Sequence, residues 1–247
     1  MEKGHIYDTL ILGSGYFSVG FSLSRKNCII CEENQICDTS FYLPLPSFEY
    51  KEYLPKTSVG KRLFEIFSEL SLFSCGMQNT NAFECAFCKF LLENPSDILL
   101  KCRVISIEKE DGFYCATVQT NEGLSRIYAE SILDTRAKGD AHFTTLFFTK
   151  EYEKDRKILT EAFPFSYTEK AFYEDRYALH IPVGEYDENT IKVAVYNKWC
   201  TLDTNAKIVY MSPTFSKKSD KEYCDEFYEN PIEAFETGYF YAKRENA

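Results

Sequence analysis

One short stretch near the start of the chain, residues 7–32, has residue types whose spacing implies a chemistry. An apolar run leads into a loop containing Gly13 and Gly15, and a second apolar run ends on the acidic residue Glu32. Gly13 would permit a tight turn, and Gly15 would let the backbone approach a pyrophosphate closely. Glu32 stands near the spacing of roughly 20 residues expected for an acid that accepts a hydrogen bond from a ribose hydroxyl. The pattern predicts a bound dinucleotide.

The residues after the second glycine extend this prediction. A helix starting at Tyr16 and Phe17 would offer free N–H groups and the positive end of its dipole to phosphates. The small side chain of Ser18 would let that helix pack on the preceding strand. Glu33, next to Glu32, adds negative charge where the 2′-phosphate of NADP would lie, so FAD and NAD are favoured over NADP. The alternative is a strand-to-helix turn with no nucleotide.

Composition limits the remaining function classes. The chain has 247 residues, 45% hydrophobic and 27% charged, with a net charge of −10. This charge repels polyanions, so we expect no nucleic-acid partner. No apolar run is long enough to span a bilayer and no signal-type segment is evident, so we expect no membrane partner and a cytoplasmic location. The ten cysteines are scattered, which favours free thiols over disulfides or a metal site.

Hydrophobic periodicity predicts an α/β organisation in the first part of the chain. Helices are expected over residues 57–72 and from residue 81 to about 93. Turn residues separate the expected strands, which are 98–102, 104–108, 113–120 and 124–129. A further apolar run, 131–133, ends in a polar loop at 134–140, where a strand of an open sheet would end and a ligand would bind.

The second part of the chain has a different pattern. Residues 143–201 are rich in aromatic and alternating residues, notably in 178–183 and 190–196, and predict a small antiparallel insert. Another strand is expected at 206–211. A final helix should begin after Asn230, with Pro231 in its first turn.

With these elements placed, the chain resembles the FAD-dependent oxidoreductases of the two-dinucleotide-binding-domain, or glutathione-reductase-like, flavoprotein superfamily. Three segments carry the resemblance: residues 8–18 with Glu32, the elements from residue 81 to 140, and residues 206–213 with 233–238. It implies a Rossmann-like FAD/NAD(P)-binding three-layer domain with a β-meander and a small antiparallel β-rich insert. The FAD domain would comprise residues 1–140 and 205–247, and the insert residues 141–204.

The resemblance also implies a cofactor and an activity. FAD would be the cofactor, with the backbone of Val104 against adenine and Asp140 near the flavin phosphate or ribityl chain. The implied reaction is hydride transfer between a small-molecule substrate and flavin, because the cofactor carries the chemistry in such enzymes. None of the three histidines, His5, His142 and His180, lies in a recognisable acid–base constellation, so the sequence assigns no catalytic residue.

Departures from the family pattern leave two alternatives open. No glycine occurs between Gly20 and Gly60, where the family has a Gly-Gly pair beside the flavin. Arg136 replaces an expected threonine of the second motif, and Ser212 lies where the closing strand would lead into Gly-Asp. One alternative is therefore a degenerate member without redox activity, acting as a binding or partner subunit. The other is an NAD-binding protein that uses the same glycine loop.

Overall fold

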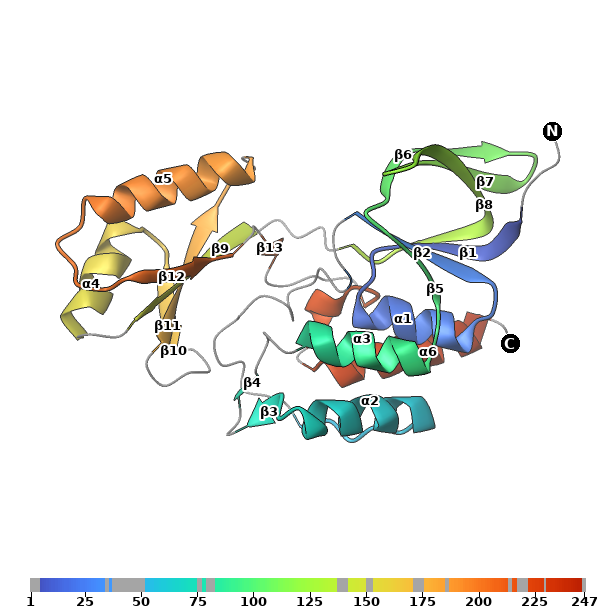
Figure 1. The fold of residues 1–247 in the computed structure, drawn as a ribbon, viewed down its shortest axis with the longest axis horizontal. Coiled ribbons are helices and arrows are strands. Elements are labelled where there is room, and N and C mark those ends of the chain that lie inside the picture. The colour runs from blue at the N-terminus through green and yellow to red at the C-terminus, as the bar shows by residue number, and fades with distance from the viewer. Residues whose placement is uncertain are drawn as a thin grey trace.

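The computed structural model places two sheets side by side, each with its own helices (Figure 1). The larger sheet contains the first strand, and the last helix packs beside it, whereas the smaller sheet is formed by residues 142–216. The structure describes residues 5–33, 36, 52–74, 77–78, 83–136, 142–149, 153–170, 176–184, 187–212, 215–216, 222–228 and 230–245.

The larger sheet has six strands in the order β5-β2-β1-β8-β7-β6. Its strands are β1 (Ile6–Leu12), β2 (Cys28–Glu32), β5 (Asp97–Leu100), β6 (Arg103–Glu110), β7 (Phe113–Thr120) and β8 (Gly123–Asp134). The pairs β5–β2, β2–β1 and β1–β8 are parallel, and β8–β7–β6 form an antiparallel meander. This mixed sheet confirms the predicted Rossmann-like α/β fold with a β-meander.

Strand β8 differs from the sequence expectation of two separate runs. It is a single strand of 12 residues. At its start, Gly123 pairs with Thr120 of β7 in the antiparallel meander, and at its end, Asp134 pairs with Leu12 of β1 in the parallel part of the sheet. No glycine or proline interrupts the stretch from Leu124 to Asp134, so nothing in the chain forces a break. One continuous strand therefore carries the chain from the meander to the edge where β1 ends.

Helices α1 (Tyr16–Ser24), α3 (Phe83–Glu93) and α6 (Pro231–Glu245) lie on one face of this sheet, and α2 (Ser58–Glu69) packs on the outer side of α3 and α6 (Figure 1). Thr57 caps α2 by accepting from the N–H of Gly60 at 2.9 Å, and Asn230 caps α6 by accepting from the N–H of Ile232 at 2.8 Å. The predicted start of the final helix is thus confirmed. Among the described residues, no helix is long and apolar enough to cross a membrane.

The alternation of side chains along the parallel strands creates three layers. Ile11 and Ile30 are buried against the helices, whereas Leu10 and Cys31 are buried against the meander. Because successive side chains of a strand point to opposite faces, each strand supplies both cores. Because β1, β2 and β8 are parallel, their carboxyl ends meet at one edge of the sheet, where the glycine loop begins.

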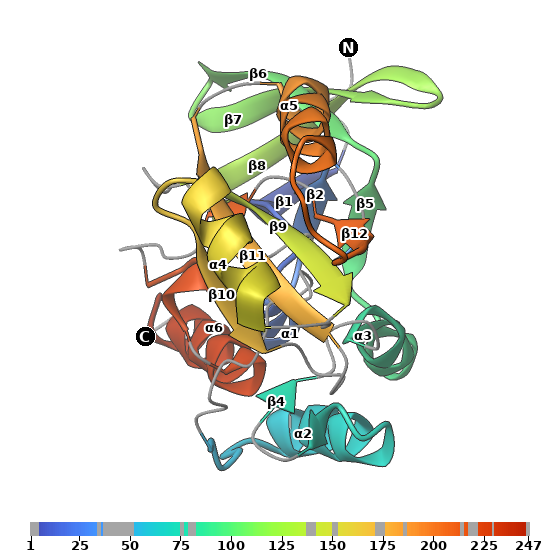
Figure 2. The same ribbon diagram turned by 90° about the vertical axis from the view of Figure 1, so that its left-hand side faces the viewer.

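The smaller sheet is antiparallel and is flanked by two helices (Figures 1 and 2). Its elements are β9 (His142–Thr149), α4 (Glu153–Ala162), β10 (Tyr167–Lys170), β11 (Arg176–Val183), α5 (Glu188–Cys200), β12 (Ile208–Met211) and β13 (Phe215–Ser216). The remaining elements are a short hairpin of β3 (Phe73–Ser74) and β4 (Met77–Gln78), and the 3₁₀ turn η2 (Asp225–Phe227).

Residues 190–196 were expected as a strand, and that prediction is wrong because they lie within α5. Asp187 caps this helix by accepting from the N–H groups of Asn189 and Thr190. Ile191 and Val195 are buried, whereas the intervening Val193 is 59% exposed. The β-branched residues at every second position suggested a strand, but burial follows the four-residue spacing of a helix.

Candidate dinucleotide site

The glycine loop lies at the carboxyl ends of β1, β2 and β8. The N–H of Gly13 donates to the carbonyl of Cys31 at 2.9 Å, and the N–H of Thr135 donates to the carbonyl of Leu12 at 2.9 Å. Gly13 has φ of +101°, a left-handed conformation that favours glycine. A Cβ at Gly13 would also lie 2.8 Å from Thr135 Oγ1. Backbone geometry and the close neighbour therefore both require glycine at this turn.

Ser18 joins the loop to the strand end that the sequence places far away. Its Oγ lies 2.7 Å from Thr135 Oγ1, and the Thr135 hydroxyl donates to the carbonyl of Leu12 at 2.9 Å. Both Ser18 and Thr135 are buried. The first segment of the family resemblance and the start of the 134–140 loop thus meet through hydroxyl contacts. Asp140, the other expected residue of that loop, lies outside the described residues.

Glu32 and Glu33 have different surroundings. Glu32 is 9% exposed, and its Oε2 accepts from both the N–H of Ser14 at 2.9 Å and the Ser14 hydroxyl at 3.0 Å. This contact fixes the carboxylate against the glycine loop. Glu33 is exposed, and its Oε1 lies 3.5 Å from Nε of Arg103. Of the two acids, only Glu32 holds the loop.

Val104 lies near the same edge on the meander side. It is paired with Val118, at a register irregularity of β6, and it packs partly buried against the meander core. The N–H of Cys102 donates to the carbonyl of Glu32 at 2.9 Å, which brings the start of β6 beside the end of β2. The start of β6, which contains Val104, therefore lies beside the acid-bearing end of β2.

Arg136, just after the end of β8, is paired with Asp134. Nε and Nη2 of Arg136 donate to the two carboxylate oxygens of Asp134 at 2.8 and 2.9 Å. The Asp134 carboxylate raises the pKa of the Arg136 guanidinium, and the charges of Glu33 and Glu32 add to the effect. Arg136 is therefore a charged, bidentately held group beside the loop.

The side chains of Tyr16 and Phe17 belong to the hydrophobic core. The Tyr16 ring packs 4.5 Å from that of Phe87, and the Phe17 ring 5.8 Å from that of Tyr241. What these two residues present to the loop is their backbone N–H groups. Gly15, the N-cap of α1, has no side chain to accept from them.

An acid from the far end of the chain occupies those N–H groups. Asp225 accepts from the N–H of Tyr16 through Oδ2 at 2.7 Å and from the N–H of Phe17 through Oδ1 at 2.9 Å. A Cβ at Gly15 would lie 2.6 Å from Oδ2. The sequence analysis did not find Asp225, because it lies in a polar segment more than 200 residues from the loop and matches no motif.

The site fits a dinucleotide in part. The turn at Gly13 and the position of Glu32 suit the fingerprint of the fold, and the buried hydroxyl of Thr135 holds the end of β8 against this turn. The α1 N-terminus does not suit the fingerprint, because Asp225 lies on the amides that a pyrophosphate would use. In the conformation described here, the dinucleotide phosphates and the Asp225 carboxylate exclude each other.

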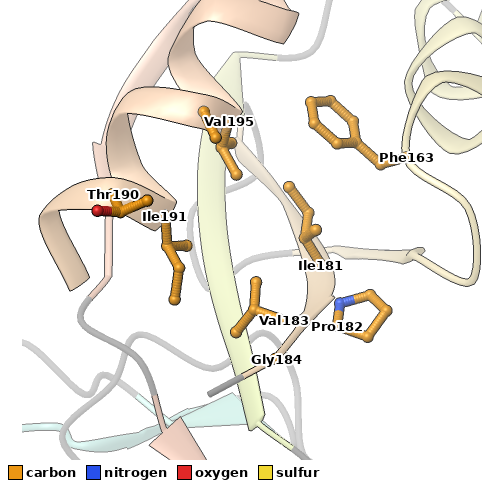
Figure 3. Close-up of a pocket in the computed structure, with 9 residues that line it drawn as sticks. Phe163, Ile181, Pro182, Val183, Gly184, Thr190, Ile191 and Val195 are labelled. Atoms are coloured by element: carbon orange, nitrogen blue, oxygen red, sulfur yellow. The ribbon is translucent and has the colours of Figure 1, made fainter. Parts of the chain in front are cut away.

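The smaller sheet contributes a buried polar cluster and an apolar cavity. His180 is 1% exposed; its Nδ1 lies 2.9 Å from Thr145 Oγ1, and its ring stacks on Tyr167. A cavity of about 450 Å³ lies between α5 and the end of β11 (Figure 3). Its lining is mainly Phe163, Ile181, Val183, Ile191, Ala194 and Val195. None of the described residues that line this cavity is titratable, so these residues offer room for an apolar group and no acid or base.

Comparison with known proteins gives the fold but no sequence family. No protein-family model and no curated protein matches the sequence. Aklavinone-11 hydroxylase, solved as a ternary complex with FAD and aklavinone, aligns with 99% of this chain at a TM-score of 0.53 and 9% identity. A p-nitrophenol 4-monooxygenase from Pseudomonas putida aligns with 96% at 0.50 and 9%, and a flavoprotein/dehydrogenase from Cytophaga hutchinsonii with 97% at 0.50 and 13%.

These likenesses define the class of fold. The chain spans 63% of the length of the aklavinone-11 hydroxylase and 77% of the other two structures. It has the fold of flavoprotein monooxygenases and dehydrogenases, with the β-meander and the separate antiparallel sheet in place.

Proposed function

We propose that this chain is an FAD-binding oxidoreductase that transfers hydride between a small-molecule substrate and flavin. The observation that carries the proposal is the convergence of Gly13, Glu32 and Thr135 at one edge of a flavoprotein-type sheet. The turn, the acid and the hydroxyl come from three different strand ends, β1, β2 and β8. Their meeting supports a dinucleotide site, since ligands of open α/β sheets bind at the carboxyl ends of strands.

Three residues of the site, Glu32, Val104 and Gly15, would each contact a different part of the cofactor. Glu32 would accept from ribose hydroxyls of the ADP part, and Val104 would lie against the adenine. The backbone of Gly15 would face the pyrophosphate. Residues 1–140 and 205–247 would form the cofactor domain, and residues 141–204 would cover the substrate. Bound flavin supplies the redox chemistry, and the protein supplies binding and orientation.

FAD binding by the purified chain tests the proposal. The protein is expected to show visible flavin absorbance, or to quench the fluorescence of added FAD with a defined stoichiometry. Heat release followed by chromatography identifies any bound nucleotide, and riboflavin serves as a control because it lacks the ADP part. A folded, colourless protein that neither takes up FAD nor gains thermal stability from it would contradict the proposal.

A second candidate function is favoured by the occupied amides of α1. A carboxylate of the chain itself, Asp225, satisfies the N–H groups of Tyr16 and Phe17. A member that had lost its flavin and served as a binding or partner subunit would need such a substitute, because buried amides require acceptors. This candidate predicts that neither FAD nor NAD changes the melting temperature of the chain.

A further inference from the structure

The N-terminus of α1 is closed by a carboxylate that has the chemistry of a phosphate. Both oxygens of Asp225 accept from backbone N–H groups, at 2.7 Å from Tyr16 and 2.9 Å from Phe17. Asp225 is 2% exposed. An anion at the start of a nine-residue helix receives both hydrogen bonds and the positive end of the dipole. The carboxylate therefore meets the same donors that a pyrophosphate would meet.

The Asp225 carboxylate approaches the backbone at Gly15 as closely as a bound pyrophosphate would. A Cβ at Gly15 would lie 2.6 Å from Oδ2, 2.8 Å from Cγ and 3.0 Å from Oδ1 of Asp225. In a dinucleotide fingerprint, this glycine is needed because the pyrophosphate approaches the backbone at this point. Here the space freed by the missing side chain is filled by Asp225.

The residues on either side of Asp225 contact two other parts of the site, Arg136 after β8 and Phe17 in α1. The Cys224 thiol donates to the carbonyl of Arg136 at 3.6 Å, and the N–H of Tyr228 donates to the carbonyl of Asp225 at 3.0 Å. The Tyr228 ring stacks on that of Phe17, with centroids 6.5 Å apart. These contacts fix η2 over the start of α1, so Asp225 belongs to a packed structure.

We propose that Asp225 is an internal substitute for the dinucleotide pyrophosphate and competes with it for the Tyr16 and Phe17 amides. In the ligand-free chain, the Asp225 carboxylate thereby blocks the pyrophosphate site. A dinucleotide binds only when this carboxylate has left the two amides. The identification of the dinucleotide as FAD rests on the proposed function; the competition itself concerns any pyrophosphate group.

Removal of the carboxylate tests the competition directly. Asp225→Asn keeps the shape of the side chain, and Asp225→Ala removes its polar end. Glu222→Gln is the matched control, because it deletes one negative charge from an exposed residue of the same segment. Circular dichroism first establishes that each variant is folded. Thermal shift with inorganic pyrophosphate and fluorescence titration with FAD are then measured against each variant's own ligand-free state.

The expected result is that both Asp225 variants gain a pyrophosphate-dependent rise in melting temperature that the wild type and Glu222→Gln lack. FAD should bind both at least about tenfold more tightly than the wild type, since the Asp225 carboxylate no longer competes. A pyrophosphate gain without FAD binding would uphold the competition and overturn the FAD assignment. If neither ligand binds the Asp225 variants better than the wild type, the competition is overturned, and wild-type FAD binding alone then decides the proposed function.

Discussion

Glu236 on α6 accepts hydrogen bonds from both the N–H and the hydroxyl of Thr57, at 2.6 and 2.7 Å. The Glu236 carboxylate is fully buried, and it also accepts from the N–H of Lys56 and from the Tyr53 hydroxyl. Burial and this carboxylate raise the pKa of Tyr53. The start of α2 is thus held by a charge from the last helix, just as the start of α1 is held by Asp225.

Replacing Glu236 by Gln should destabilise the fold strongly. The side-chain amide of Gln would place its own N–H groups against the N–H and hydroxyl donors that the Glu236 carboxylate accepts from. The free energy of unfolding should therefore fall by about 2–3 kcal/mol. Urea denaturation followed by circular dichroism measures the change. Glu233→Gln, one turn earlier in the same helix, should cost less than about 1 kcal/mol. Equal losses in the two variants would contradict the assigned role of Glu236.

Gly238→Ala should also destabilise the protein, although alanine is the better helix former by about 1 kcal/mol. A Cβ at Gly238 would lie 2.0 Å from the carbonyl oxygen of Phe17, and one at Gly20 would lie 1.9 Å from that of Phe235. Because these neighbours are backbone atoms, α1 and α6 must separate, which should cost about 3 kcal/mol. Lys243→Ala, at an exposed position of the same helix, is the control. A thermal melt in which Gly238→Ala is the more stable protein would show that the helices do not pack this closely.

The two adjacent acids should differ in their effect on cofactor binding. If FAD binds as proposed, Glu32→Gln should weaken it at least about tenfold, because a charged hydrogen-bond partner of the loop and the ribose is lost. Glu33→Gln should leave the Kd nearly unchanged, since its carboxylate faces exposed Arg103. Fluorescence titration of the two variants compares them directly. A similar loss in both would point to a general charge effect and away from a specific role for Glu32.

Burial of the Cys28 thiol should slow its alkylation and make the stability of the fold depend on pH. Burial raises its pKa from 9.0 to about 11. The stabilisation that follows is complete below about pH 9 and is lost as the pH rises through about 11, because the folded state disfavours the thiolate. Iodoacetamide at pH 9 should therefore modify exposed Cys85 and Cys200 well before Cys28 in native protein. Peptide mapping by mass spectrometry gives the order, and in urea the difference should disappear.

Much of the larger domain could be predicted because its signals are local. The turn at Gly13, the acid at the end of β2 and the Asn230 cap each depend on residues within one element or its neighbours. The meander followed from the turn residues, with Asp111 and Gly112 both in left-handed conformations. Periodicity failed in α5, where Ile191, Val193 and Val195 alternate like a strand and only the capping by Asp187 reveals a helix.

The occupant of the candidate site could not be predicted from spacing. Asp225 reaches Tyr16 across more than 200 residues of sequence, and the contact exists only because α6 and η2 return to α1. The 134–140 loop was expected to lie at a ligand-binding edge, whereas the hydroxyl contact of Thr135 with Ser18 depends on the register of β1 with β8. Both contacts are tertiary and join elements far apart in the sequence, so no local pattern contains them.

The close packing of α1 against α6 also governs when the domain can form during synthesis. Residues 16–24 are made more than 200 residues before their packing partner, residues 231–245. The apolar face of the first helix and the amides at its start therefore lack their final contacts until residues 231–245 have been made. Such long-range closure is expected to make folding slow and to leave nascent chains dependent on protection from aggregation.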